Sequence, residues 1–136
     1  MVRITLGEKL MQRMPDGCGF SAENLHLLIV VVCEFLSDYT INGCASRHYN
    51  AQTYYIASQA QACVNEILAS WLSKLPFEHI DGYSSREVVA QALSWAIFGP
   101  ATRWLQNGHK TTPQELAACI VPFALSALQP VLAAVN

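Results

Sequence analysis

The sequence predicts an all-α fold, an antiparallel bundle of about five helices. Apolar residues recur at three- and four-residue steps in successive stretches, and short breaks containing glycine or proline separate these stretches. No hairpin pattern, internal repeat or low-complexity tract interrupts the series. The chain of 136 residues and 15.0 kDa is long enough for one domain that buries its own core.

The first two elements differ in length. Residues 1–14 show a short amphipathic pattern that ends at the Pro15–Gly17 break, and we interpret it as the end of a longer helix. Ser21 is expected to cap a second helix that stops at Gly43. The apolar run at 27–32 would also suit a buried strand, but no partner strand is predicted nearby. The apolar positions of this helix are Leu25, Leu28, Ile29, Val32, Leu36 and Tyr39.

A third helix is expected over residues 49–73. Its polar side chains are mostly uncharged amides, and residues 74–83 contain Pro76 and Gly82 and form a connection. Its apolar residues at helical spacing are Ile56, Ala60, Cys63, Ile67 and Trp71.

The stretch from Ser84 to Gln106 predicts a helix with very little polar surface. Ser84 and Glu87 have the spacing of a capping box. No charged side chain follows Glu87 until Arg103, and such a helix is buried on more than one face. Pro100 removes one backbone hydrogen bond and is expected to bend the helix.

The last stretch repeats this pattern. Thr112 is expected as the N-cap, Pro113 takes the first helical position, and Glu115 follows three residues after the cap. Residues 116–135 carry no charge, and Pro122 is expected to bend this helix as well. Two consecutive helices of this kind exceed what one small core needs, so we expect them to form a surface for a partner.

The composition argues against several classes of protein. Only 13% of residues are charged, about half the usual share. The net charge is −2 and the eight Lys and Arg are scattered singly, so we expect no direct nucleic-acid binding by this chain. The N-terminus lacks the apolar core of a secretory signal. Residues 116–135 are long enough to span a bilayer, but their prolines and weak hydrophobicity argue for a cytoplasmic protein without a membrane anchor.

The cysteines and histidines do not predict a reactive site. There are five cysteines, and Cys33, Cys63 and Cys119 sit in apolar helical patterns, which predicts buried free thiols in a reducing cytosol. Cys44 and His48 are four residues apart, but no second pair completes a zinc site and no third group completes a catalytic set. We therefore expect no metal, no cofactor and no enzymatic activity.

Several strings in the second half of the chain resemble one known family. They are the LSWAIFG string at 93–99, Trp104, the TPQEL string at 112–116 and the IVPF string at 120–123. Together they resemble the C-terminal half of a TetR-family transcriptional regulator, most closely over residues 84–132. The resemblance implies that the last two helices pack against their mates from a second subunit as a four-helix dimer interface. It also implies that the preceding helices surround a pocket for a small molecule.

The chain departs from that family at its N-terminus. Family members begin with a three-helix DNA-binding domain, whereas only about twenty residues precede Ser21. We expect residues 1–20 to be the remnant of a connecting helix and a loop, and residues 21–136 to be the ligand-binding and dimerisation domain.

Two sets of site residues follow from the pattern and the resemblance. Ligand pockets combine apolar and aromatic walls with a few polar groups, so the expected effector is small and apolar or aromatic. The candidate ligand-binding residues are Tyr39, Tyr54, Tyr55, Gln59, Cys63, Trp95 and Phe98. The candidate dimer-interface residues are Trp95, Gly99, Thr102, Phe123, Ala127, Leu128 and Val131.

The expected function is that of an effector-binding and dimerisation domain of a TetR-like regulator of transcription, an activator or a repressor. Because Gly99 has no side chain, it would let another helix come close, so Gly99→Trp should break the dimer while Gln59→Leu should spare it. The alternative is an interaction protein without a DNA-binding domain, which forms heterodimers with full-length regulators and needs no ligand.

Overall fold

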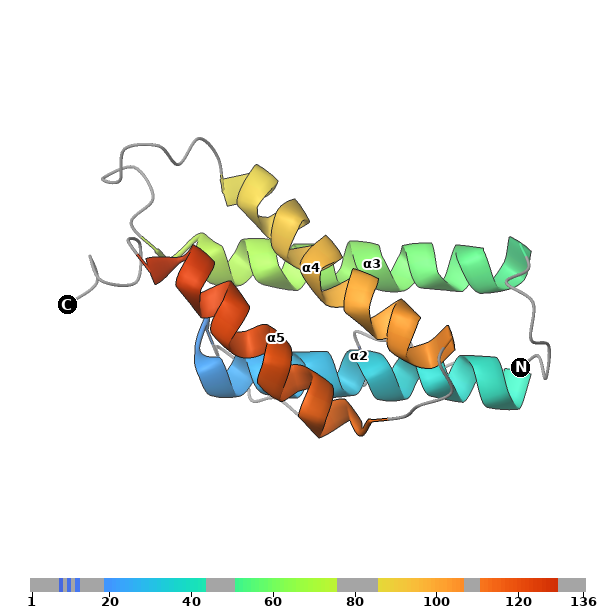
Figure 1. The fold of residues 1–136 in the computed structure, drawn as a ribbon. Helices are drawn as coiled ribbons and strands as arrows, with labels where there is room; N and C mark the ends of the chain where they lie inside the picture. The colour runs from blue at the N-terminus through green and yellow to red at the C-terminus, as the bar shows by residue number, and fades with distance from the viewer. Residues whose placement is uncertain are drawn as a thin grey trace.

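The computed structural model describes residues 19–43, 51–75, 86–106 and 111–129, together with Glu8, Leu10 and Gln12. Within these ranges the chain is all-helical, as predicted, and no strand occurs in them. The helices are α2 (Ala22–Gly43), α3 (Ala51–Leu72), α4 (Arg86–Gln106) and α5 (Pro113–Ala127) (Figure 1). About five helices were expected, and the described part of the chain contains four. The first expected helix lies almost wholly outside it, although Glu8, Leu10 and Gln12 have helical backbone.

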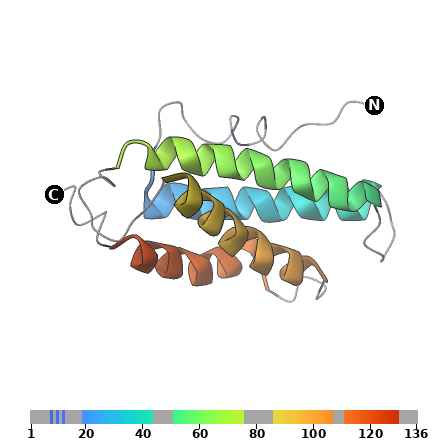
Figure 2. The ribbon, with the colours of Figure 1, turned by 90° about the horizontal axis from the view of Figure 1, so that it is seen from above.

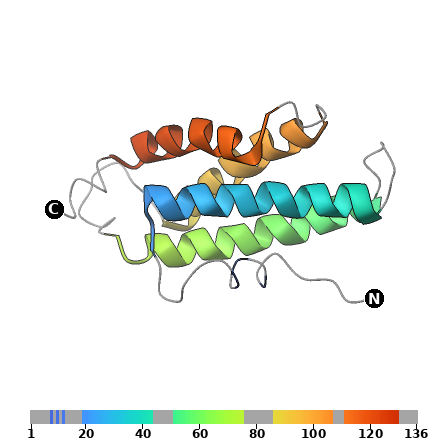
Figure 3. The same ribbon diagram turned by 90° about the horizontal axis from the view of Figure 1, so that it is seen from below.

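The four helices form two layers, and each runs opposite to the helix before it (Figure 1). Helices α2 and α3 lie side by side, and α4 and α5 cover one face of this pair (Figures 2 and 3). Helix α5 packs mainly along α2, while α4 packs along α3 and also contacts α2 and α5. The two most apolar segments of the sequence therefore form one outer layer together.

Helix α2 is the centre of the core. Ser21 caps it as predicted, because the Asn24 amide donates to Ser21 Oγ at 3.1 Å. The apolar run at 27–32 is helical, so the helical prediction is confirmed over the strand alternative. A helix that is apolar on several sides requires neighbours on several sides, and α3, α4 and α5 supply them. The α2 side chains that are buried in this core are Leu25, Leu28, Ile29, Val30, Val31, Val32, Cys33, Phe35 and Leu36.

Hydrogen bonds join the end of α4 to the start of α5. The indole Nε1 of Trp104 donates to the carbonyl oxygen of Thr111 at 2.6 Å. The next residue, Thr112, is the predicted N-cap: its Oγ1 accepts from the Glu115 amide at 3.1 Å, and Glu115 Oε1 accepts from the Thr112 amide at 2.8 Å. Pro113 begins the helix, as predicted. The other predicted capping box depends on Ser84, which lies outside the described residues.

The end of α3 is tied to the start of α4 by one side chain. Arg86 donates from Nε to the carbonyl oxygen of Leu72 at 3.1 Å and from Nη2 to that of Leu75 at 2.8 Å. A cation at a helix C-terminus satisfies carbonyl groups that have no partner within the helix and complements the helix dipole. This contact holds the first residue of α4 against the C-terminal end of α3.

Candidate functional site

Helix α4 carries a solvent-facing stripe that follows a heptad spacing, with alternating steps of four and three residues. We call it the α4 stripe. Trp95 is 62% exposed and Val88 is 57% exposed, and Thr102 is partly buried. No member of the stripe is charged. Its residues are Val88, Ala92, Trp95, Gly99, Thr102 and Gln106.

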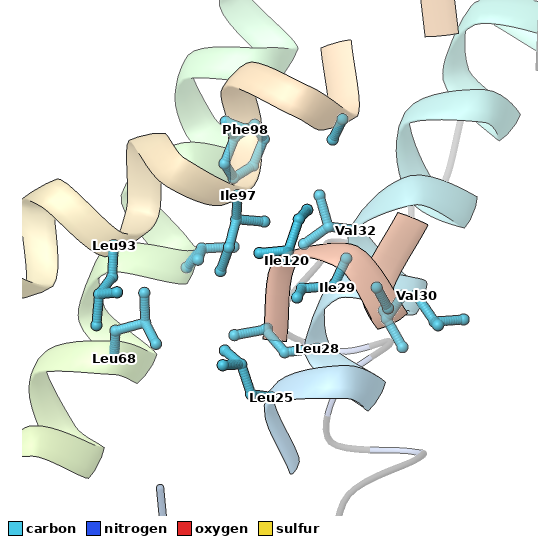
Figure 4. Close-up of a cluster of buried hydrophobic side chains, with 14 of the residues drawn as sticks. Leu25, Leu28, Ile29, Val30, Val32, Leu68, Leu93, Ile97, Phe98 and Ile120 are labelled. Carbon is cyan, nitrogen blue, oxygen red and sulfur yellow. The ribbon is translucent and has the colours of Figure 1, made fainter. Parts of the chain in front are cut away.

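The opposite side of α4 is buried within the chain. Figure 4 shows Leu93 of α4 facing Leu68 of α3, and Ile97 of α4 pointing into the space where α2 and α5 meet. Phe98 is 2% exposed and also belongs to this core. Since α4 already contributes a full set of side chains to the core, the α4 stripe is surplus apolar surface.

Helix α5 has a comparable surface, which we call the α5 face. Phe123 is 66% exposed, the highest value among the large apolar side chains of the described residues. Cys119 is exposed, which corrects the expectation that it is buried: α5 turns it away from α2. The exposed residues of the α5 face are Ala118, Cys119, Pro122, Phe123, Ser126 and Ala127. None of them is charged.

Gly99 lies in the α4 stripe with open space above it. A Cβ added to Gly99 would meet no heavy atom within 4 Å, so nothing within the described chain requires glycine here. Glycine inside a helix costs about 0.5–1 kcal/mol relative to alanine. Next to it, Thr102 Oγ1 donates to the carbonyl oxygens of Phe98 and Gly99 at 2.8 and 3.0 Å, so its hydroxyl is satisfied within its own helix. Within the described residues, no contact of Gly99 compensates for this cost.

The candidate dimer residues divide into two groups. Trp95, Gly99 and Thr102 lie together on the α4 stripe, and Phe123 and Ala127 lie on the α5 face. Leu128 was included wrongly, because it is 1% exposed and belongs to the chain's own core. It follows the end of α5, where its side chain lies on the same side of the helix as Ala124, which is also buried. Val131 lies outside the described residues.

The candidate ligand residues do not gather at one place in the described part. Gln59 is exposed on α3, Cys63 is half-buried, Trp95 is exposed and Phe98 is buried. Trp95 and Phe98 therefore belong to opposite sides of α4. Tyr39, Tyr54 and Tyr55 have helical backbone, but their side chains lie outside the described part.

A polar contact that the sequence reasoning missed lies between α3 and α4. Gln61 Nε2 donates to Ser94 Oγ at 2.8 Å, and Ser94 is fully buried. One turn further along α3, the Oδ1 atom of Asn65 is buried without a hydrogen-bond partner. The available signal was that Gln61 and Asn65 are four residues apart on a helix whose polar residues are mostly uncharged amides. We call Gln61, Asn65 and Ser94 the α3–α4 polar cluster.

Two of the thiols are protected by their surroundings. Burial, with a smaller contribution from the charge of Glu34, raises the pKa of Cys33 from 9.0 to about 12. Burial also raises the pKa of Cys63, and the neighbouring charge of Glu66 adds to the effect. These thiols are therefore poor nucleophiles at neutral pH.

The pKa of Cys33 leads to a prediction for alkaline conditions. The folded state holds the thiol proton more tightly than the unfolded state, so its contribution to stability is complete below pH 9.0 and declines as the pH rises toward 12. We expect the free energy of unfolding of the wild-type chain to fall in this window more steeply than that of Cys33→Ala. Urea denaturation at pH 8, 9.5 and 11 measures the difference, and parallel curves would contradict the assignment.

The described residues show neither a metal site nor a helix that could span a membrane. In the described ranges no group of three or more His, Cys, Asp and Glu side chains could hold a metal ion, and Cys44 and His48 fall outside those ranges. None of the described helices is long and apolar enough to cross a membrane.

Family models, curated proteins and solved structures were each compared with the chain, and none of them matches it.

Proposed function

We propose that the chain is a homodimerising sensor domain of a TetR-like transcriptional regulator, with the α4 stripe and the α5 face as its dimer interface. The observation that carries the proposal is the exposure of Trp95 and Phe123 on two uncharged helical surfaces of the same outer layer. Exposed apolar residues scattered singly are normal, but an uncharged stripe along a whole helix is typical of an interaction surface.

The energetics favour covering both surfaces at once. The exposed parts of Val88, Trp95 and Phe123 would each contribute roughly 1–2 kcal/mol if a partner buried them. Association costs about 4–15 kcal/mol in lost freedom of motion, so one side chain per protomer is not enough. A twofold dimer doubles every contact and brings both outer helices of each copy into the interface.

A second copy suits these surfaces because they lack charge. From Val88 to Thr102 the α4 stripe has no charged side chain, and the α5 face has none either. Two identical charged surfaces would repel each other, whereas two identical apolar surfaces attract. The low overall charge of 13% agrees with a protein that buries part of its surface against itself.

The effector-binding part of the proposal is supported by the α3–α4 polar cluster. Asn65 Oδ1 is a buried acceptor without a partner, next to the paired Gln61 and Ser94. A small aromatic molecule with one N–H donor would satisfy this acceptor. Because α4 contributes both to this cluster and to the α4 stripe, a ligand there would act on the helix that forms the interface.

The mass of the purified chain in detergent-free buffer tests the dimer. Sedimentation equilibrium at micromolar concentration is expected to give twice 15.0 kDa, with dissociation upon dilution. A mass of 15.0 kDa at every concentration would exclude the homodimer. Mixing with a full-length regulator would then test the heterodimer alternative.

Indole and 1-methylindole test the effector site as a matched pair. Indole has an N–H group that could donate to Asn65 Oδ1, which has no hydrogen-bond partner. In 1-methylindole a methyl group replaces this hydrogen, while the aromatic ring system is the same. We expect indole at millimolar concentration to raise the melting temperature of the wild-type chain but not that of Asn65→Leu. Equal effects of the two compounds would mean that the Asn65 acceptor is not a ligand contact.

A further inference from the structure

We propose that the two copies pair through antiparallel α4 helices in one specific register, in which Trp95 of each copy packs over Gly99 of the other. The twofold axis then passes at the level of Ile97. This inference rests on the proposed homodimer and adds to it which side chains face each other.

The α4 stripe is symmetric about residue 97. Trp95 and Gly99 lie two residues on either side of it, Ala92 and Thr102 lie five, and Val88 and Gln106 lie nine. In an antiparallel pair about a twofold axis, a residue before the axis faces the residue at the same distance after it. Every residue of the α4 stripe therefore faces another residue of the same stripe.

Side-chain size favours this register. A tryptophan, the largest side chain, faces a glycine, which has none, and an alanine faces a threonine of moderate size. The space above Gly99 is open, since a Cβ there would meet nothing within 4 Å. Glycine is unfavourable inside a helix. In this register it makes room for the indole of the other copy, a role that it does not have in the isolated chain.

Registers with the axis at Trp95 or at Gly99 lose this complementarity. An axis at Trp95 would place the two indoles against each other and would bring Gly99 opposite Gln91, which lies outside the α4 stripe. An axis at Gly99 would place glycine opposite glycine. This would leave an empty space between the helices that neither indole fills. An axis at residue 97 fills the space at Gly99 and covers both indoles.

The charges near the α4 stripe do not oppose this pairing. Arg103 is exposed and lies six residues from the axis. Its two copies are therefore about 18 Å apart along the helices, farther than the Debye length of about 8 Å at physiological ionic strength.

The α4 pair needs the α5 helices at its sides. The stripe spans 19 residues, from Val88 to Gln106, which is about 27 Å of helix with a width of about 10 Å. A stable interface buries about 800 Å² per partner, more than such a strip provides. The α5 face, with Phe123 at 66% exposed, is the adjoining apolar surface of the same layer, so the interface consists of four helices.

Complementary variants test the register. Gly99→Trp places two indoles at one position and Trp95→Ala leaves the position empty, so each variant alone is expected to dimerise at least about 100-fold more weakly than the wild type. When the two variants are mixed, each large side chain meets a small one. An equimolar mixture with one tagged chain is therefore expected to form the heterodimer with nearly wild-type affinity, as measured by native mass spectrometry.

Disulfide cross-linking tests the same register without a change of volume. A mixture of Ala92→Cys and Thr102→Cys chains is expected to form a cross-linked heterodimer upon treatment with diamide, because facing residues in a helix pair bring their Cα atoms within about 7 Å. Ala92→Cys alone is expected to give no more cross-linking than the wild type, which controls for the native cysteines.

The outcomes separate this inference from the dimer itself. If the wild type dimerises but the mixed variants do not restore association, or Ala92→Cys cross-links as well alone as in the mixture, the register is wrong and the homodimer stands. If the wild type is monomeric at every concentration, both proposals are wrong. Far-UV circular dichroism of Gly99→Trp checks that it remains helical, as the open space at Gly99 leads us to expect.

Discussion

Trp95→Glu is expected to raise the dissociation constant of the dimer by about 100- to 1,000-fold. Trp95 is 62% exposed in the single chain, so its replacement removes little from the core of the protomer. In the dimer it would be a central aromatic anchor, and a glutamate there would bring an unpaired charge into an apolar interface. Sedimentation equilibrium over a range of concentrations measures the change.

The matched control for this variant is Gln59→Glu. Gln59 is also exposed on a helix, but it lies on α3, outside the α4 stripe and the α5 face. Gln59→Glu introduces the same charge as Trp95→Glu. It is expected to leave the dissociation constant of the dimer within about twofold of the wild-type value. A dimer that survives Trp95→Glu would place the interface elsewhere, and a dimer lost in both variants would point to a general effect of charge.

Leu28→Ala is expected to lower the free energy of unfolding by about 2–5 kcal/mol and the melting temperature by roughly 10 °C. Leu28 is fully buried in α2, in the cluster where α4 and α5 meet it (Figure 4). The substitution removes apolar contacts and leaves a cavity that close-packed neighbours fill only in part.

The Leu28 measurement is best made in the Trp95→Glu background, where association does not add to the stability. Urea denaturation then reports on the protomer alone. Gln59→Ala is the control, since it truncates an exposed side chain on a helix and is expected to change the free energy of unfolding by less than about 0.5 kcal/mol. A similar small effect of Leu28→Ala would contradict the central position of α2.

Much of the fold could be predicted because its signals are local. The caps at Ser21 and Thr112 and the end of α2 at Gly43 depend on residues within one helical turn, and the structure confirms all three. The excess of apolar residues in the last two helices also indicated correctly that they are not fully covered by their own chain. Val88, Trp95 and Phe123 are the large apolar side chains that remain exposed in the described part of these helices.

The errors came from positions on apolar helices whose direction was not known. Cys119 and Leu128 lie in the same uncharged stretch, yet Cys119 is exposed and Leu128 is 1% exposed. Periodicity distinguishes an apolar side of a helix from a polar one, but a helix that is apolar all round gives no such contrast. The same ambiguity assigned Trp95 and Phe98 to one pocket, although α4 turns them to opposite sides.

The sequence by itself determined where α2 and α5 begin and that the C-terminal pair has apolar surface to spare, because capping and composition act over a few residues. Only the tertiary structure decided which side of α4 faces the core, because that depends on how α4 packs against α2 and α3. Packing alone made Gly99 an open position beside Trp95, and it joined Gln61 to Ser94 across 33 positions of the chain. Contacts between distant residues are set by the arrangement of whole helices, and no local pattern encodes them.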